Sequence, residues 1–426
     1  MQVYLDMVGC RLNQSELEGY ARQFRQAGHT ITSHAELADL IVINTCTVTS
    51  AADSDSRQKI RQAARSAAGQ VVVTGCWATL NRAEAAAFPG VTQVIGNLEK
   101  DDLVPLVLKV SRFDFAGKSI QREPIPGSRL RTRAFIKVQD GCDNYCTYCV
   151  TTLARGVGRS RRIPDVLTDI HSALGGGSQE VVLTGVHLGS WGYDFEPPSN
   201  LSHLVDAILT STETPRLHLS SLEPWDVSPD LLQLFQNHRL CRHLHLPLQS
   251  GCKATLKRMG RRITPEAYTS LVLQARTAIP GLSITTDIIT GFPGETDREF
   301  SMSAHFVRKT AFANGHVFTY SARPGTAAAR LPDQVPHSVA KQRNAHMREI
   351  FRQSSAIFQN EQLGQDLMVL WEKAVPLGLS QWQLSGLTDN YLRVRTISAS
   401  PCYNQIMRVH ITAAEHGELV GEITQA

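Results

Sequence analysis

Apolar runs alternate with amphipathic stretches over the first 110 residues. VYLDMV precedes SELEGYARQFRQAG, LIVINT precedes AADSDSRQKIRQAARSAAG, and QVVVTG precedes NRAEAAAF. Short apolar runs that are each followed by helical periodicity indicate strands alternating with helices. We therefore expect an α/β domain with a parallel sheet over residues 1–110.

A second alternating series begins after a break in the pattern. Residues 111–134 carry two prolines and two glycines without an apolar period, which predicts a linker. The runs AFIKVQ, EVVLTG, RLHLSS, HLHLPL, SITTDIITG and HVFTYS then follow, separated by helical stretches. Six βα units predict a partial parallel barrel, (βα)6, over residues 135–362, with its site at the C-terminal ends of the strands.

The pattern changes again near residue 363. DLMVLWEKA, QLSGLTDNYLRVRT, NQIMRVHITAA and ELVGEI are short and β-rich, and turns separate them. This pattern predicts a small all-β barrel over residues 363–426.

Composition narrows the class of protein. The net charge of +4 over 426 residues is too small to make nucleic acid the default partner, and we expect no DNA partner. The N-terminus lacks a cationic start followed by an apolar stretch, and no apolar run is long enough to span a bilayer. We therefore expect a cytoplasmic protein without a membrane partner. Nine cysteines in such a chain favour metal ligation or catalysis over disulfides.

Three cysteines form the loop GCDNYCTYC directly after the first barrel strand, with the spacing C-x3-C-x2-C: Cys142, Cys146 and Cys149. Three thiolates can hold three irons of a 4Fe-4S cluster and leave the fourth iron open for a small molecule. The alternative is a zinc site, but structural zinc normally takes four protein ligands and this loop offers no fourth. The loop therefore predicts an iron-sulfur centre that carries out chemistry.

Three more cysteines, Cys10, Cys46 and Cys76, each follow one of the N-terminal apolar runs. Parallel strands bring their C-terminal ends to one edge of a sheet, so these thiols could meet there as a second metal site. The alternative is three ordinary core thiols. The remaining cysteines, Cys241, Cys252 and Cys402, fit no ligand pattern, and we interpret them as structural.

Polar groups at the ends of the barrel strands are candidates for cofactor contacts. They are Thr184, Gly185, Ser220, Ser221, Glu223, Gln249, Ser250, Asp287 and Gly291, together with Tyr148 in the cluster loop. Two basic stretches could hold RNA phosphates or a cofactor carboxylate, or could simply be solvated: Arg155, Arg159, Arg161 and Arg162, and then Lys257, Arg258, Arg261 and Arg262.

The cluster loop, with an aromatic residue before its last cysteine, resembles the signature of the radical S-adenosylmethionine superfamily. Beyond it, the chain resembles the methylthiotransferases almost from end to end, in GCRLNQSE, NTCTVTSAADSDSRQKIRQA, VTGCWA, LTGVHLGSWG, HLHLPLQSGCKATLKRMGRR, DIITGFPGET and YSARPGT. Within that family these segments are most similar to the branch that acts on N6-threonylcarbamoyladenosine of tRNA.

The resemblance implies two 4Fe-4S clusters and S-adenosylmethionine as cofactors. Cys142, Cys146 and Cys149 would hold the cluster that cleaves S-adenosylmethionine to a 5'-deoxyadenosyl radical. Cys10, Cys46 and Cys76 would hold an auxiliary cluster that carries the sulfur. The implied reaction is methylthio transfer to C2 of the adenosine directly 3' of the anticodon, at tRNA position 37, with electrons from a donor such as flavodoxin or ferredoxin.

Other functions stay open at this point. The alternatives are methylthiolation of an isopentenylated tRNA adenosine or of a ribosomal-protein aspartate, and a non-catalytic iron-sulfur protein that carries electrons or binds RNA. The chain also departs from the family pattern, with Thr152 and Leu153 where relatives usually carry Pro-Tyr. Its last segment resembles the family's TRAM domain but has four basic against six acidic residues, a net charge of −2, so RNA binding there rests on the resemblance alone.

Overall fold

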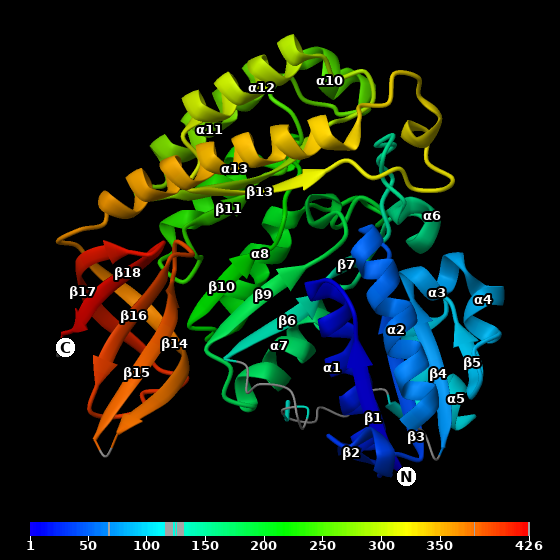
Figure 1. Ribbon diagram of the computed structural model, residues 1–426. Coiled ribbons are helices and arrows are strands. Elements are labelled where there is room, and N and C mark those ends of the chain that lie inside the picture. The colour runs from blue at the N-terminus through cyan, green and yellow to red at the C-terminus, as the bar shows by residue number, and fades with distance from the viewer. Residues whose placement is uncertain (67–68, 116–121, 124, 126–131, 379, 425–426) are drawn as a thin grey trace.

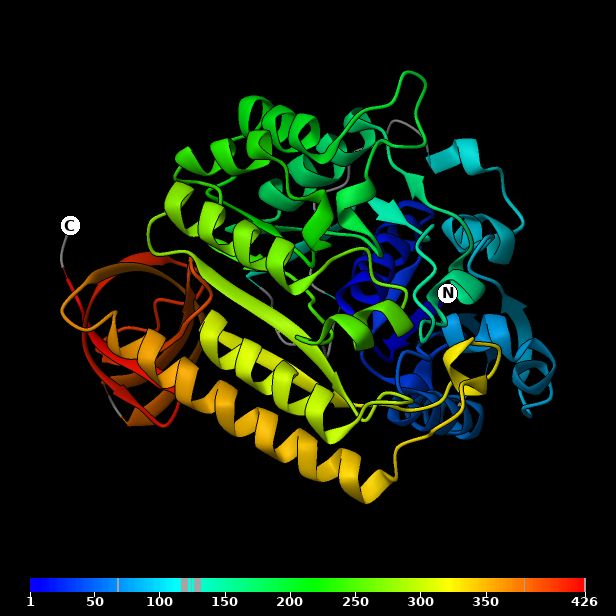
Figure 2. The ribbon, with the colours of Figure 1, turned by 90° about the horizontal axis from the view of Figure 1, so that it is seen from above.

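The computed structural model describes residues 1–66, 69–115, 122–123, 125, 132–378 and 380–424. It contains an N-terminal parallel sheet with its helices, a central set of parallel strands, and a C-terminal barrel (Figure 1). The N-terminal sheet and the C-terminal barrel lie on opposite flanks of the central strands, as Figure 2 shows from above. Most of the predicted linker, residues 111–134, lies outside the described residues.

The N-terminal sheet is parallel and has the strand order β2-β1-β3-β4-β5. Its strands are β1 (Gln2–Met7), β2 (Thr30–Thr32), β3 (Leu40–Thr45), β4 (Gln70–Gly75) and β5 (Val91–Ile95), and its helices are α1 (Arg11–Gln26), α2 (Ser50–Ser66), α3 (Cys76–Leu80), α4 (Arg82–Ala86) and α5 (Leu103–Leu108). Helices cover both faces, so β3 is entirely buried, with Leu40 and Val42 in one core and Ile41 and Ile43 in the other. The predicted parallel α/β fold is confirmed.

The central strands form two three-stranded parallel sheets, β10-β9-β6 and β11-β12-β13. Parallel bridges between Leu217 and Leu240 and between Ser221 and His245 join the two sheets into one curved half-barrel. The strands are β6 (Arg133–Lys137), β9 (Glu180–Thr184), β10 (Arg216–Leu219), β11 (His243–His245), β12 (Ser283–Thr290) and β13 (Asn314–Thr319). These are the six strands that the sequence predicted.

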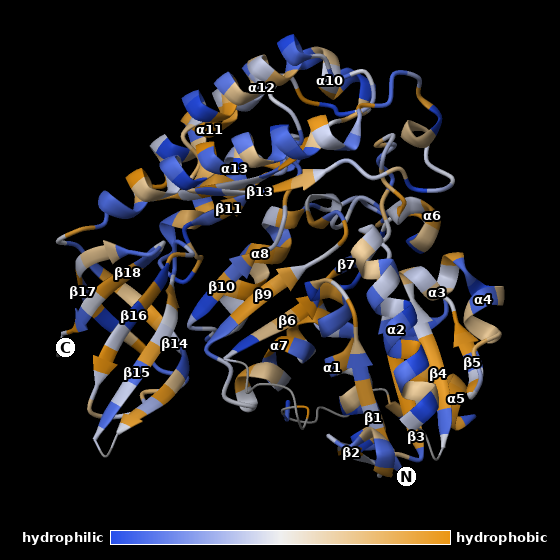
Figure 3. Cartoon of the chain, in the orientation of Figure 1, coloured by the Kyte–Doolittle hydropathy of each residue, from blue (hydrophilic) through white to orange (hydrophobic). Residues whose placement is uncertain are grey.

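Helices cover the outside of this half-barrel. They are α7 (Ile163–Gly175), α8 (Leu201–Ser211), α9 (Pro229–Gln233), α11 (Pro265–Ala278), α12 (Asp297–Thr310) and α13 (His337–Asn360), and the shorter α6 (Thr151–Arg155) and α10 (Lys253–Arg258) lie in the loops. Figure 3 shows hydrophobic residues along β4 and β9 and mainly hydrophilic ones on the outer helices α12 and α13. The pattern places the core between strands and helices. None of the described helices is long and apolar enough to cross a membrane.

The C-terminal strands form a closed barrel in the order β14-β15-β16-β18-β17. They are β14 (Asp366–Gly378), β15 (Gln381–Thr388), β16 (Arg393–Ser398), β17 (Ile406–Glu415) and β18 (Glu418–Ile423), packed around a core that includes Trp371. This confirms the predicted all-β barrel.

The C-terminal barrel covers the N-terminal ends of the half-barrel strands. Arg216, at the start of β10, donates to the carbonyl of Leu387 at 3.0 Å. Arg242, just before β11, forms an ion pair of 2.6 Å with Asp389. Because this end is closed by protein, the opposite end, where the strand C-termini meet, is left for the site. A short ladder of β7 (Gln139–Asp140) and β8 (Arg159–Ser160) borders that end.

Candidate functional site

The cysteines of the GCDNYCTYC loop, here called the radical triad, lie between β7 and α6. The Cys149 amide donates to the Cys146 carbonyl at 3.0 Å and tightens the loop. The amides of Asn144 and Thr151 donate to the sulfurs of Cys142 and Cys149, each at 3.4 Å. Amide donors aimed at sulfur stabilise thiolates and the clusters that they hold.

The radical triad opens into a cavity of about 280 Å³, here called the cluster cavity. Five of the predicted cofactor contacts line it: Tyr148, Ser221, Glu223, Gln249 and Asp287. Burial raises the pKa of the Cys146 and Cys149 thiols. Binding of a metal cluster would therefore release protons from this site. A cavity with polar side chains in its wall beside three thiols suits a small cofactor that carries polar groups.

Arg261, from the second basic stretch, is buried beside the radical triad rather than solvated. Its guanidinium forms a two-pronged ion pair with Glu223, at 2.9 and 2.6 Å, and stacks 4.7 Å above the Trp225 ring. It also approaches Cys146 Sγ at 3.8 Å. Arg258 pairs with Glu299, whereas Lys257 and Arg262 are exposed. Within this second basic stretch, Arg261 therefore lies beside the radical triad, whereas Lys257 and Arg262 face solvent.

His187 is a site residue that sequence reasoning did not identify. It lines the cluster cavity, and its Nε2 lies 2.5 Å from Asp226 Oδ2. Burial alone would lower the pKa of His187, but hydrogen bonds to Asp226 and Cys142 outweigh it and raise the pKa to about 10. His187 therefore places an imidazole, paired with Asp226, beside the radical triad. Its position just beyond the end of β9 was the signal that could have identified it.

A larger cavity, of about 820 Å³, fills the inner face of the half-barrel and is here called the central cavity. The predicted residues Thr184, Gly185 and Ser220 line it, and Ser221 and Asp287 line both cavities. Inward-facing residues of the central strands alternate along its wall, as expected for strands with one face inward. The two cavities therefore adjoin at the ends of the strands.

Gly291 and Ser250, two other predicted contacts, line neither cavity. The Gly291 amide donates to Glu295, and a Cβ at Gly291 would collide with the side chain of Ala340 on α13. The Ser250 hydroxyl accepts from the Cys252 amide at 3.2 Å. Gly291 serves the packing of α13 against β12, and its predicted contact with a cofactor stays a prediction.

Cys10, Cys46 and Cys76, here called the N-terminal triad, converge at the C-terminal edge of the N-terminal sheet. Cys10 directly precedes α1, Cys46 follows β3, and Cys76 begins α3 after β4. The approach is close, because a Cβ on Gly9 would lie 2.7 Å from Cys46 Sγ. Burial, with smaller contributions from the Cys10 and Cys76 charges, raises the pKa of Cys46 to about 11. Cys10 also lines the central cavity, which shares Ser221 and Asp287 with the cluster cavity beside the radical triad.

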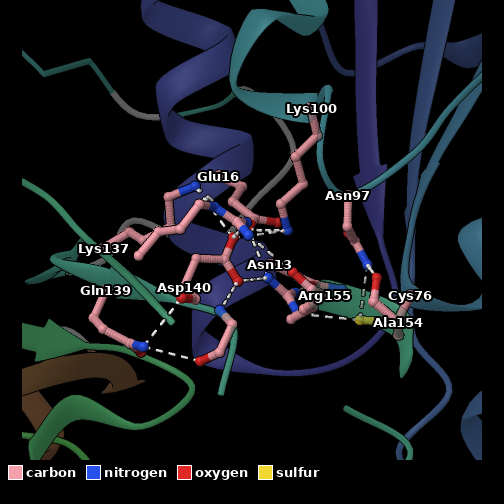
Figure 4. Close-up of polar contacts among 12 residues, drawn as sticks. Asn13, Glu16, Cys76, Asn97, Lys100, Lys137, Gln139, Asp140, Ala154 and Arg155 are labelled. Carbon is pink, nitrogen blue, oxygen red and sulfur yellow. Dashed lines mark hydrogen bonds and ion pairs between the residues drawn. The ribbon is translucent and has the colours of Figure 1, made fainter. Parts of the chain in front are cut away.

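Arg155 links the N-terminal triad to the half-barrel through a buried polar network (Figure 4). Its Nε donates to Cys76 Sγ at 3.2 Å, and its other nitrogens donate to Asp140 at 2.8 Å, Asn13 at 2.9 Å and Glu16 at 3.1 Å. Its side chain is 2% exposed. The expectation that Arg155 contacts RNA is wrong, because the guanidinium is enclosed and already paired.

Lysines complete the same network. Lys100 forms ion pairs with Glu16 and, at 3.5 Å, with Asp140, and Lys137 lies 3.6 Å from Asp140. Burial would raise the pKa of Glu16, but Lys100 and the neighbouring cations outweigh it and lower the pKa to about 2. Both carboxylates are therefore ionised, and Asn97 adds a donor 3.6 Å from Cys76 Sγ.

The other arginines of the first basic stretch differ in exposure. Arg161 forms an ion pair of 2.6 Å with Asp169 and donates to the Lys137 carbonyl. Arg159 keeps 37% of its side chain exposed, and Arg162 is exposed at the start of α7. Arg159 and Arg162 are thus the members of this stretch that remain accessible to an RNA phosphate.

Family comparisons cover most of the chain. Residues 2–96 match the Uncharacterized protein family UPF0004, and residues 136–307 match the Radical SAM superfamily. The chain is similar to the threonylcarbamoyladenosine tRNA methylthiotransferase MtaB of Bacillus subtilis, with 34% identity over 96% of this chain and 93% of that protein. It is 36% identical to the Thermotoga maritima protein of the same name, over 92% of this chain and 90% of that one.

Other relatives are named for a different tRNA substrate. The tRNA-2-methylthio-N(6)-dimethylallyladenosine synthase of Trichlorobacter lovleyi is 33% identical over 99% of both chains. Among solved structures, the radical S-adenosylmethionine methyltransferase TsrM of Kitasatospora setae, with cobalamin and a [4Fe-4S] cluster bound, has a TM-score of 0.59 at 14% identity. The match covers 77% of each chain. This likeness shows the fold.

Proposed function

Because the chain belongs to the radical S-adenosylmethionine methylthiotransferase family, we propose that it transfers a methylthio group to C2 of N6-threonylcarbamoyladenosine at position 37 of tRNA. The family relation includes relatives named for both threonylcarbamoyl and dimethylallyl adenosines, so the substrate has to be argued from the site. The hydrogen-bonding side chains in the wall of the central cavity favour the threonylcarbamoyl substrate.

Many polar side chains of the central strands line this cavity. Besides the predicted contacts, its wall includes His243, His245, Ser283, Thr285, Asn314, His316, Ser355 and Gln359. Apolar side chains such as Leu12 and Phe318 also form part of the wall. An isopentenyl group would leave buried donors and acceptors without partners, at about 1–3 kcal/mol for each group. The hydroxyl and carboxylate of a threonylcarbamoyl group would pair with them.

The two triads fit the two 4Fe-4S clusters of the family. Each triad supplies three thiols, and each receives donors to sulfur: amide N–H groups at Cys142 and Cys149, and Arg155 at Cys76. We assign the radical triad to the cluster that binds S-adenosylmethionine and the N-terminal triad to the auxiliary cluster. When bound, these groups supply a radical that activates the C2–H bond and the sulfur that replaces the hydrogen.

The residues of this chain position the reactants and exclude water. Tyr148, Glu223 and Gln249 line the cluster cavity and are suited to hold the polar groups of S-adenosylmethionine. The C-terminal barrel and the N-terminal end of α1 both contribute residues to the wall of the central cavity. They would therefore enclose a nucleotide that enters it. A base stacked in an anticodon loop is out of reach of such a site, so the target nucleotide must be extruded.

Arg159 and Arg162 are suited to hold tRNA phosphates at the mouth of the site, since they are exposed near the radical triad. The reaction also needs an external electron donor, for which flavodoxin or ferredoxin has the right chemistry. In this proposal the N-terminal domain, residues 1–110, carries the sulfur. The central domain, residues 135–362, generates the radical, and the C-terminal barrel, residues 363–426, covers the central cavity.

Nucleosides from a deletion strain test this proposal. Total tRNA from the strain lacking this chain should contain N6-threonylcarbamoyladenosine and lose its 2-methylthio derivative, as measured by liquid chromatography and mass spectrometry. The chain carrying alanines at the radical triad is the matched control and should not restore the product. Loss of the methylthio derivative of isopentenyladenosine instead would overturn the substrate assignment.

A further inference from the structure

The charges of the central cavity are unevenly paired. Its wall includes the arginines Arg11 and Arg393. Arg393 lies 3.7 Å from Glu372 and 4.0 Å from Glu418, so carboxylates of the chain already neutralise it. Arg11 contacts the Tyr391 hydroxyl and the Tyr391 and Phe135 rings, and among the described residues it forms no ion pair with a carboxylate. Arg11 is therefore the cavity arginine whose charge is left for a ligand.

Neighbouring aromatic side chains hold Arg11 in place. Its NH2 group donates to the Tyr391 hydroxyl at 2.5 Å, and its guanidinium lies 5.6 Å from the centre of the Tyr391 ring and 5.9 Å from that of Phe135. Tyr391 is itself stacked on His243, with ring centres 4.5 Å apart. The hydrogen bond uses one of the five N–H groups of the guanidinium, so a fork of donors remains for a carboxylate.

The position of Arg11 along the chain matches the geometry of the substrate. In adenine only N1 separates C2 from C6, so a substituent on N6 lies on the same edge of the base as C2. The side chain that contacts this substituent must therefore be close to the group that delivers sulfur to C2. Arg11 begins α1 directly after Cys10, the member of the N-terminal triad that lines the central cavity.

We infer that Arg11, held by Tyr391, is the specificity-determining residue that binds the carboxylate of the threonylcarbamoyl group. This inference rests on the proposed function and names the group that reads the substrate. It also gives the C-terminal barrel a part in substrate choice, because Tyr391 lies in the loop between β15 and β16. An isopentenyl group has no charge for Arg11 to bind.

Binding of two synthetic anticodon stem-loops tests the inference. One carries N6-threonylcarbamoyladenosine, and the other carries the same group with its carboxylate replaced by a neutral amide. Reconstituted full-length protein should bind the carboxylate form roughly 10- to 100-fold more tightly, the usual range for hydrogen bonds to a charged group. Arg11→Gln should reduce this ratio to about twofold or less, and Arg11→Lys and Tyr391→Phe should give intermediate ratios.

Arg65→Gln is the matched control, since Arg65 is exposed near the end of α2, away from the cavity wall. It should keep the wild-type ratio. A full ratio in Arg11→Gln, or an equal loss of affinity for both stem-loops, would overturn the inference. If Arg11→Gln fails to fold, as judged by its iron content, Arg11→Lys is measured in its place, and a wild-type ratio in that variant would overturn the inference. Wild-type protein that forms no methylthio product on the carboxylate stem-loop would instead refute the proposed function.

Discussion

Arg155→Met tests whether the buried network supports the N-terminal triad. Methionine fills a similar volume but removes the donor to Cys76 Sγ and the charge between Glu16 and Asp140. It also leaves Asn13 Oδ1 without its guanidinium partner. The variant should therefore lose both stability and the capacity to hold the auxiliary cluster.

The magnitude follows from the partners that remain. Removing one member of a buried ion pair costs about 3–5 kcal/mol. Lys100 still pairs with Glu16 and lies 3.5 Å from Asp140, so we expect the lower end of that range for the charges. The unpaired Asn13 oxygen adds about 1 kcal/mol. A total of about 4 kcal/mol is a large fraction of the stability of a domain.

Thermal unfolding of the iron-free protein, followed by circular dichroism, measures this loss. The first transition of Arg155→Met should move down by roughly 10 °C or more. Reconstituted Arg155→Met should hold about half the iron of the wild type and still cleave S-adenosylmethionine. Arg162→Met is the control, because Arg162 is exposed and its loss should change stability by about 0.5 kcal/mol at most. Unchanged melting and unchanged iron in Arg155→Met would refute the reasoning.

Three further predictions concern the triads, the network and the mouth of the site. The wild type should hold about eight irons per chain, since two cubane clusters are implied. Alanines at the radical triad should leave about half of this iron and abolish 5'-deoxyadenosine formation. Alanines at the N-terminal triad should instead keep 5'-deoxyadenosine formation and stop methylthio transfer. Full iron in the N-terminal variant would show that its cluster site is misplaced. The pKa of Glu16 is depressed from 4.5 to about 2, so its stabilising contribution is present above pH 4.5 and is lost as the pH falls toward 2. In Glu16→Gln, the free energy of unfolding measured by urea titration should therefore depend less on pH between 4.5 and 2. An unchanged pH dependence would contradict this role of Glu16. Arg159→Gln with Arg162→Gln should weaken tRNA binding and reduce its salt dependence while 5'-deoxyadenosine formation without tRNA persists; loss of that formation at unchanged tRNA affinity would point to a cofactor contact instead.

The hydrophobic pattern predicted most of the fold. The buried strands β3 and β4 and the six central strands carry continuous or alternating apolar runs, and these runs specify their partners. The edge strands β2 and β5 were not predicted. β2 has three residues, and β5 exposes Thr92 and Gln93, so neither forms an apolar run.

The candidate site could be predicted in part, because strand ends converge. This rule brought both triads and most of the predicted polar residues to the two cavities. It could not show which charges are buried against other charges. Arg155 and Arg159 are both basic residues in one short stretch, and only packing separates the enclosed one from the exposed one.

Side chains contributed by distant segments were the other limit. Arg11 and Tyr391 are 380 positions apart in the chain, and the pattern of neither segment points to the other. His187 lay inside a segment already assigned to the family, but its partner Asp226 lies 39 positions further along the chain. Pairings between domains depend on how whole domains dock, and periodicity carries no information on that docking.

A competition between two tRNAs tests directly whether this enzyme selects the threonylcarbamoyl substrate. Reduced, reconstituted enzyme is mixed under single-turnover conditions with equal amounts of a tRNA carrying N6-threonylcarbamoyladenosine and one carrying the isopentenylated base, and the methylthio products are measured by mass spectrometry. Because Arg11 and many polar side chains line the central cavity, we predict product almost entirely on the threonylcarbamoyl tRNA. Equal rates on both tRNAs, or product on the isopentenylated tRNA alone, would contradict the account.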